Sequence, residues 1–306
     1  MQIVRYSEQT LKIAVISKNP VLVSQYEKVD AGEQRLMNEA FQPANWITSH
    51  PEAPQDFEQF FSHPYRKTPS PDKRSIYIQS IGKYCTRIIS EEYIKWLTGY
   101  CKAYFYRLRV KLLKPVPVST TRCSFRVNEN TQNLQIHAGD ILKFLKKKKP
   151  EDAFCVVGIT MIDLYPRDLW NFVFGQASLT DGIPFLALLL EMLKEGKKFQ
   201  PRIILIFKTV LETGHIFNLF LEIWGFFHLE EADRHPLNLG PICLHKLQCA
   251  IGFSIVERYK ALVRWIDDES SGTPGATPEH SREDNGNLVK PEWKEWIIKC
   301  LTVLQK

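Results

Sequence analysis

The chain has 306 residues, enough for one large domain or two ordinary ones with a buried core. Its 44% hydrophobic and 24% charged residues are typical of a globular protein, and a net charge of +6 is too small to indicate a nucleic-acid partner. Seven scattered cysteines do not suggest a disulfide framework, and no secretory signal is evident, so we expect an intracellular protein, cytoplasmic or nuclear. The longest apolar run, residues 183–190, is too short to span a membrane.

The N-terminal half mixes irregular and regular predicted segments. Residues 1–40 show loose helical patterning, whereas residues 41–72 contain six prolines and predict an irregular segment. Apolar and polar residues roughly alternate over 75–81, as in a strand. Ser90 is a predicted helix N-cap. The helix that it begins has one apolar face, which we expect to pack in the core: Tyr93, Trp96, Leu97 and Tyr100.

The middle of the chain predicts an α/β (α+β) layer arrangement. Residues 107–118 read as a strand with one solvated face, and residues 133–137 lead into a helix that ends at Pro150. The lysines at 146–149 suit a solvated helix C-terminus better than a nucleic-acid patch. Further predicted elements are a central strand over 154–165, a second strand over 172–179, a helix from 183 to about Gly196 and a strand over 202–207.

The C-terminal part predicts two helices separated by a polar segment. The first helix covers residues 252–267 and carries one apolar face: Ile255, Tyr259, Leu262 and Trp265. Residues 269–289 are rich in Gly, Pro and Ser and predict a flexible linker. Residues 290–306 predict a C-terminal helix that docks on the core. We therefore expect one domain over residues 1–268, followed by the linker and this helix.

The most informative stretch is residues 209–249, which holds four of the eight histidines. A zinc peptidase helix reads H-E-x-x-H, because two imidazoles one turn apart bind the metal and the glutamate polarises its water. Here Leu211 occupies the first histidine position, Glu212 the glutamate position and His215 the second histidine position. The longer metzincin motif adds a third histidine, where this chain has Leu221. Taken alone, the Glu-x-x-His pair is a weak signal, because such pairs occur by chance.

The flanking sequence adds a family resemblance. Residues 156–182 and 228–271 resemble archaemetzincins, the vertebrate type-2 branch in particular, and so does the proline-rich N-terminal half. The resemblance implies a compact metzincin-like domain with a mixed sheet and an active-site-type helix. It also implies descent from a zinc metallopeptidase of aminopeptidase type that acts on short peptides. Residues 183–227 do not follow the family, and we expect this cleft region to be shortened.

The same resemblance assigns roles to a few residues. Glu212 matches the general base, and His215 matches one ligand of the catalytic zinc. Cys243 matches one of four cysteines that hold a structural zinc in relatives, while Leu211 and Leu221 replace two catalytic histidines. Glu212 is thus a vestigial base. We expect zinc to be bound weakly or not at all.

These observations predict a pseudoenzyme: an archaemetzincin-like metalloprotease, in ancestry a hydrolase, that is catalytically inactive. One alternative is a residual zinc metalloprotease that hydrolyses peptide bonds with Glu212 as general base. Another is a non-enzymatic binding protein, or a poorly folded product of a degenerate gene copy. A peptide substrate is expected only if the chain is active, and we expect neither a nucleic acid nor a membrane as partner.

Other side chains in this stretch have ordinary structural interpretations. Recruitment of His228, His235 and His245 as substitute ligands is less favoured than solvated surface histidines. Cys243 and Cys249 are expected to pack as small apolar residues rather than to ligate a metal. The dense apolar pattern of residues 210–227 favours a buried helix over a wet metal cleft.

Overall fold

The computed structural model describes most of the chain between residues 57 and 305. The described residues are 57–64, 66–82, 91–169, 173, 175–178, 180–187, 213, 217, 241–271 and 291–305. The predicted helical pattern of 1–40 and the predicted strand of 202–207 lie outside them, as does most of the predicted linker. No helix within the described ranges is long and apolar enough to cross a membrane.

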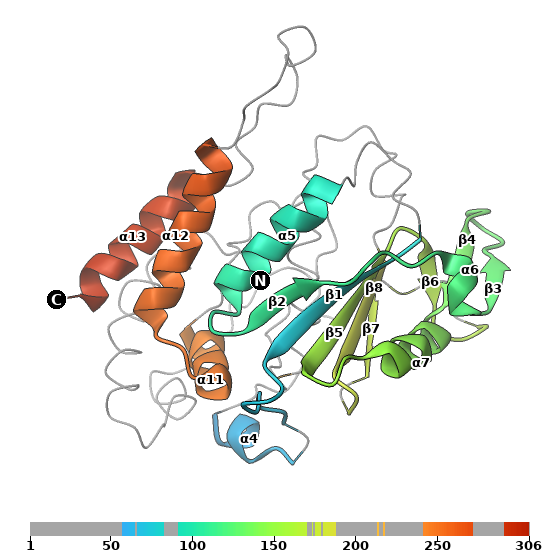
Figure 1. Cartoon of the computed structure of the whole chain (residues 1–306), viewed down its shortest axis with the longest axis horizontal. Coiled ribbons are helices and arrows are strands. Elements are labelled where there is room, and N and C mark those ends of the chain that lie inside the picture. The colour runs from blue at the N-terminus through green and yellow to red at the C-terminus, as the bar shows by residue number, and fades with distance from the viewer. Residues whose placement is uncertain are drawn as a thin grey trace, which may run out of the picture.

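A five-stranded sheet forms the centre of the fold, in the order β2-β1-β5-β8-β7 (Figure 1). Its strands in that order are β2 (Arg109–Leu112), β1 (Ser75–Ile81), β5 (Ala153–Thr160), β8 (Ile183–Ala187) and β7 (Gly175–Ser178). The first four run parallel, and β7 pairs antiparallel at the edge. Every residue of β1 and β5 is buried, as expected where helices cover both faces of a parallel sheet. The predicted mixed sheet is confirmed.

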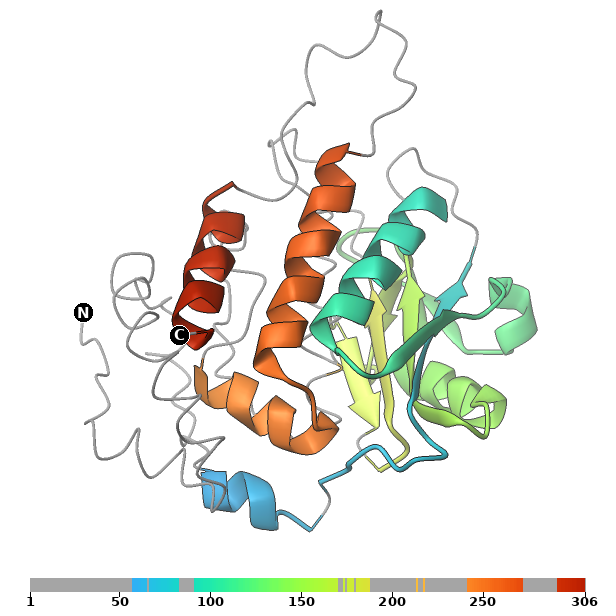
Figure 2. The same ribbon diagram turned by 60° about the vertical axis from the view of Figure 1, so that its left-hand side comes forward.

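Three helices lie in succession on one side of this sheet (Figures 1 and 2). These are α5 (Glu91–Tyr104) next to the sheet, then α12 (Ile255–Ser271), then α13 (Pro291–Leu304). The predicted apolar faces are confirmed as core by the buried side chains Trp96, Leu97, Tyr100, Ile255, Tyr259, Leu262 and Trp265. A Cβ at Gly99 would lie 3.2 Å from the Trp265 ring, so this glycine permits the close approach of α5 and α12.

The opposite face of the sheet is covered by α7 (Ala138–Lys148). Side chains of β1 alternate between two cores, since Ile76 and Ile78 join the α5 side and Tyr77 joins the α7 side. Ile141 and Leu145 are the fully buried residues by which α7 closes the second core. The sequence predicted this helix, its end before Pro150 and the lysines at its solvated C-terminus.

A second, three-stranded sheet has the order β3-β4-β6. It contains β3 (Phe125–Val127), β4 (Leu134–His137) and β6 (Asp163–Tyr165), and the short α6 (Val118–Thr121) precedes it. The prediction of one strand over 154–165 is therefore wrong, because the chain turns at Met161 and Ile162. There the Ile162 amide donates to Thr160 Oγ1 at 3.2 Å, and β6 leaves the main sheet to pair with β4.

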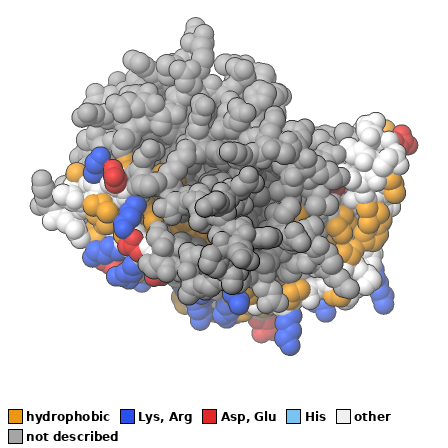
Figure 3. Space-filling view, turned by 90° about the horizontal axis from the view of Figure 1, so that it is seen from above, with side chains coloured by type: hydrophobic (Ala, Val, Ile, Leu, Met, Phe, Trp, Pro, Cys, Tyr) orange, Lys and Arg blue, Asp and Glu red, His pale blue; other side chains and the backbone are white. Residues whose placement is uncertain are grey.

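Exposed apolar side chains lie on the β3–β4 pair of this small sheet. Val127 and Leu134 face each other across β3 and β4, with 55% and 49% of their surface exposed. Figure 3 shows hydrophobic side chains gathered at the right-hand end of the molecule, where Figure 1 places these strands.

Three more segments differ from the sequence-based expectations. Ile183–Ala187 forms β8 and not the first turns of a helix, because a short apolar run fits a buried parallel strand as well as a buried helix. Within the proline-rich segment, Phe57–Ser62 forms the helix α4, and Phe60 is fully buried. Pro241–Ile251 forms the helix α11, for which no helix was predicted.

The cysteines of the described residues carry free thiols, as expected from their scattered positions: Cys101, Cys123, Cys155, Cys249 and Cys300. Burial raises the pKa of Cys101 and of Cys155 to about 12. These two thiols are therefore packing groups in the core and not nucleophiles.

Candidate functional site

The residues singled out by the zinc motif are only partly covered by the structure. Glu212, His215, Leu211 and Leu221 lie outside the described residues. Cys243 lies in the first turn of α11, and its side chain is not described. Within the described ranges, no group of three His, Cys, Asp or Glu side chains could hold a metal ion.

Two described residues lie within the motif region, and both are buried. Thr213 has helical backbone conformation and 0% exposed surface. Phe217 is also 0% exposed, and its ring lies 4.8 Å from the ring of Phe154 in β5 and 5.9 Å from that of Phe105 after α5. The segment that carries the zinc motif is therefore anchored in the main core by Phe217.

The helix α11 brings His245 and Cys249 together. The Cys249 Sγ atom lies 3.8 Å from His245 Nε2, and only 1% of His245 is exposed. Burial lowers the pKa of His245 and raises that of Cys249 to about 11, so a neutral imidazole faces a protonated thiol. The expectation of a solvated surface histidine is wrong for His245, because α11 turns it inward. Cys249 packs against the core, as predicted.

The surroundings of this pair are apolar and cationic. Lys246 is only 2% exposed, and its ammonium lies 5.8 Å from the centre of the Phe60 ring of α4. The Arg66 guanidinium lies 5.2 Å from the centre of the same ring. Lys246 of α11 and Arg66 after α4 thus both contact Phe60, so the described side chains of α4 and α11 form a packed interface.

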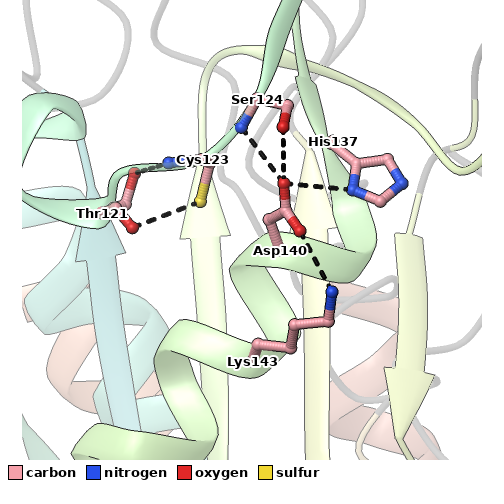
Figure 4. A network of polar contacts seen from close by, with 6 residues as sticks. All are labelled: Thr121, Cys123, Ser124, His137, Asp140 and Lys143. Carbon is pink, nitrogen blue, oxygen red and sulfur yellow. Dashed lines mark hydrogen bonds and ion pairs between the residues drawn. The ribbon is translucent and has the colours of Figure 1, made fainter.

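A polar network between β3 and α7 was not predicted from the sequence (Figure 4). Asp140 Oδ2 accepts hydrogen bonds from Ser124 Oγ at 2.8 Å and from the Ser124 amide at 3.2 Å. His137 Nδ1 lies 3.3 Å from the same oxygen, and Lys143 Nζ lies 3.3 Å from Asp140 Oδ1. A signal existed in the sequence, because Asp140 stands in the first turn of a predicted helix, where a carboxylate suits the helix dipole.

The network contains Ser, His and Asp side chains, but not in a catalytic order. A nucleophilic serine must hydrogen-bond to a histidine that removes its proton. Here Ser124 donates directly to Asp140, and His137 contacts the carboxylate instead of the serine (Figure 4). The arrangement fastens β3 to the start of α7 and supplies no activated hydroxyl.

The Asp140 carboxylate should make stability depend on acid pH. Burial opposes its ionisation, but hydrogen bonds from Ser124, Lys143 and His137 outweigh burial and lower the pKa of Asp140 to about 2. Its folded pKa is below the unfolded value, so its contribution is present above pH 4 and is lost as pH falls toward 2. When the pH is lowered from 5 to 2, the free energy of unfolding should fall less for Asp140→Asn than for the wild type. The difference between the two decreases should be about 1 kcal/mol or less.

Urea denaturation at several pH values measures this difference, and Asp268→Asn is the matched control because Asp268 is exposed on α12. The control should follow the wild-type curve. Equal acid sensitivity of Asp140→Asn and the wild type would contradict the assigned role.

The relatives found by comparison with known proteins come from one family. No family model matches the chain. Archaemetzincin-2 of Homo sapiens is 70% identical over 360 residues, and the match covers 100% of both chains. Archaemetzincin-2 of Rattus norvegicus is 57% identical with the same coverage, and archaemetzincin-1 of Mus musculus is 32% identical, covering 85% of this chain and 62% of its own. The crystal structure of archaemetzincin from Methanopyrus kandleri is 20% identical and covers 60% of this chain and 97% of that one, with a TM-score of 0.44.

These relatives place the chain in a metallopeptidase family, and its fold is mixed α/β. The chain belongs to the archaemetzincin family. The resemblance of residues 156–182 and 228–271 is thereby confirmed.

This chain is shorter than its relatives. The alignment with the human relative spans 360 positions and this chain has 306 residues, so at least 54 positions (360 − 306) have no residue here. The sequence predicts that the shortening falls within 183–227. That location stays a prediction.

Proposed function

We propose that this chain is a catalytically inactive archaemetzincin whose remaining role is in binding. The observation that carries the proposal is leucine at two of the three histidine positions, Leu211 and Leu221. A leucine side chain has no atom that can donate to zinc. Loss of a single outer-shell partner already reduces metal affinity on the order of 10–100-fold, and here two direct ligands are replaced. The residues present do not fit the catalytic zinc of the family, and we derive no hydrolytic step through it.

The burial of Thr213 and Phe217 supports retention of the scaffold without its chemistry. Thr213 has helical backbone conformation, Phe217 lies in a turn four residues later, and both side chains are buried. In the sequence, His215 is the one histidine left at the two motif positions, because Leu211 stands at the other. One imidazole beside an apolar side chain holds zinc poorly.

Metal analysis and a cleavage assay on the purified full chain test the proposal. We expect well below one zinc per chain after dialysis, measured by plasma mass spectrometry, and no cleavage of short peptides with free N-termini. Human archaemetzincin-2 should be measured in parallel. Glu212→Gln should change neither result, since the base has no metal-bound water to polarise.

Two other outcomes would favour the alternatives. One tightly held zinc per chain, with cleavage abolished by Glu212→Gln, would establish a residual zinc metalloprotease and sink the inactive assignment. A broad, non-cooperative thermal melt would favour a poorly folded product. A double substitution, Leu211→His with Leu221→His, separates the causes, because a gain of bound zinc would show that only the ligands are missing.

A further inference from the structure

Three lysines contact the turn that joins β7 to β8, and a fourth lysine stands at the same edge of the sheet. Lys67 Nζ donates to the Thr180 carbonyl, and Lys149 Nζ donates to the Asp181 carbonyl at 2.6 Å. Lys146 Nζ forms an ion pair with Asp181 Oδ1 at 2.9 Å. Lys73 stands two residues before β1, at the same edge of the sheet, and its charge lowers the pKa of both Lys67 and Lys149. We call Lys67, Lys73, Lys146 and Lys149 the lysine cluster.

The cluster lies at the amino ends of the parallel strands. β1 begins at Ser75, two residues after Lys73, and β8 begins at Ile183, directly after the turn. Lys149 follows the last turn of α7 and precedes β5. Residues far apart in sequence are thus held at one edge of the main sheet. Lys149 is fixed further by a 2.9 Å hydrogen bond to the Phe154 carbonyl.

Positive charge is in excess at this edge. Among the described residues, Asp181 and the exposed Asp72 beside Lys73 oppose four ammonium groups, while Asp152 at the same edge pairs with Lys111 and Arg109. Burial lowers the pKa of Lys67 and of Lys149, and the neighbouring lysines lower it further, while Asp181 opposes the effect. Bringing like charges together in a partly buried place raises their free energy, and a bound dianion would offset this.

Several ammonium N–H groups of the lysine cluster make no hydrogen bond within the described structure. An ammonium group has three N–H donors. In the described structure Lys149 uses two of them and Lys67 uses one, and the Lys73 side chain makes no hydrogen bond there. Fastening the turn explains the contacts of Lys67, Lys146 and Lys149, but it does not explain the added positive charge of Lys73 at this edge.

We propose that the lysine cluster binds a phosphate-type dianion at the amino edge of the main sheet. Its source is a small phosphorylated molecule or the phosphorylated headgroup of a lipid, which present the same oxygens. Lys67 and Lys73 supply the open donors, and Lys149 provides a fixed positive charge behind them. This binding is independent of the proposed loss of zinc chemistry.

Thermal denaturation and calorimetry of the full chain with inorganic pyrophosphate test the site. At 10-fold excess over its dissociation constant, pyrophosphate should raise the wild-type melting temperature by about 2–3 °C, relative to sodium chloride of equal ionic strength. Lys67→Gln with Lys73→Gln should reduce this shift at least about threefold. Lys149→Gln is avoided as the main variant, because Lys149 also supports the fold.

Lys147→Gln with Lys148→Gln is the matched control: both residues are exposed on α7, and the double substitution removes the same charge. This control should keep the full shift. An equal loss in both double variants, or no shift beyond the salt reference, would overturn the site. Binding to vesicles with phosphoinositide, compared with phosphatidylcholine alone, identifies the lipid source if pyrophosphate competes. Binding of pyrophosphate without vesicle binding identifies the small-molecule source.

Discussion

Replacing Arg258 by methionine is expected to lower the free energy of unfolding by about 3 kcal/mol. Arg258 is fully buried in α12, and its Nε donates to the Tyr104 carbonyl at the end of α5 at 2.8 Å. Its guanidinium also lies 4.7 Å from the centre of the Tyr104 ring. Methionine fills similar space but leaves that carbonyl without this donor. Urea denaturation followed by tryptophan fluorescence measures the change.

Arg264→Met provides the control on the same helix, because Arg264 is exposed. It should change stability by no more than about 0.5 kcal/mol. Arg258→Lys should recover only part of the loss, since an ammonium cannot reproduce the planar donor. Equal stabilities of Arg258→Met and Arg264→Met would show that Arg258 does not join α12 to α5.

Replacing Phe217 by alanine is expected to lower the free energy of unfolding by about 3–5 kcal/mol. Its ring packs against Phe154 and Phe105 with no exposed surface, and its removal leaves a cavity between the sheet and α5. The effect should appear as a shift of the urea midpoint with an unchanged slope.

Phe61→Ala is the matched control, because 52% of Phe61 is exposed at the surface of α4. It should lower stability by clearly less than Phe217→Ala. A Phe217→Ala variant as stable as the wild type would mean that the motif segment is not anchored in the core. The proposed inactive assignment would then lose its structural support, although the missing zinc ligands would remain.

Helices whose apolar residues recur at a regular spacing could be predicted from the sequence. The helices α5 and α12 were predicted because apolar side chains recur on one face, and α13 was predicted in the same way. Ile183–Ala187 was wrongly predicted to begin a helix, because buried strands and buried helices have the same apolar composition over so few residues. The turn after Thr160 contains a side-chain hydrogen bond to the Ile162 amide, and the hydrophobic periodicity of the sequence gives no sign of this turn.

Some features of the candidate site could also be predicted from the sequence, and others could not. Leucine at positions 211 and 221 is visible in the sequence, because the zinc motif has fixed spacing. The inward orientation of His245 is not visible, since it follows from how α11 packs on α4. The lysine cluster also escapes prediction. Only the fold brings Lys67 and Lys149 to one turn, and the sequence alone favoured a solvated helix end for the lysines at 146–149.

The contact between α5 and α12 gives this chain an internal optical reporter. The rings of Trp96 and Trp265 lie 5.4 Å apart at an angle of 49°, although 169 residues separate them in sequence (265 − 96). Two indoles so close and so inclined couple their electronic transitions, which produces a circular dichroism signal that exists only when both helices are docked. A compact state with fluctuating packing would keep its helices but lose this signal. The tryptophan pair can thus separate a folded inactive archaemetzincin from a collapsed product without any added label.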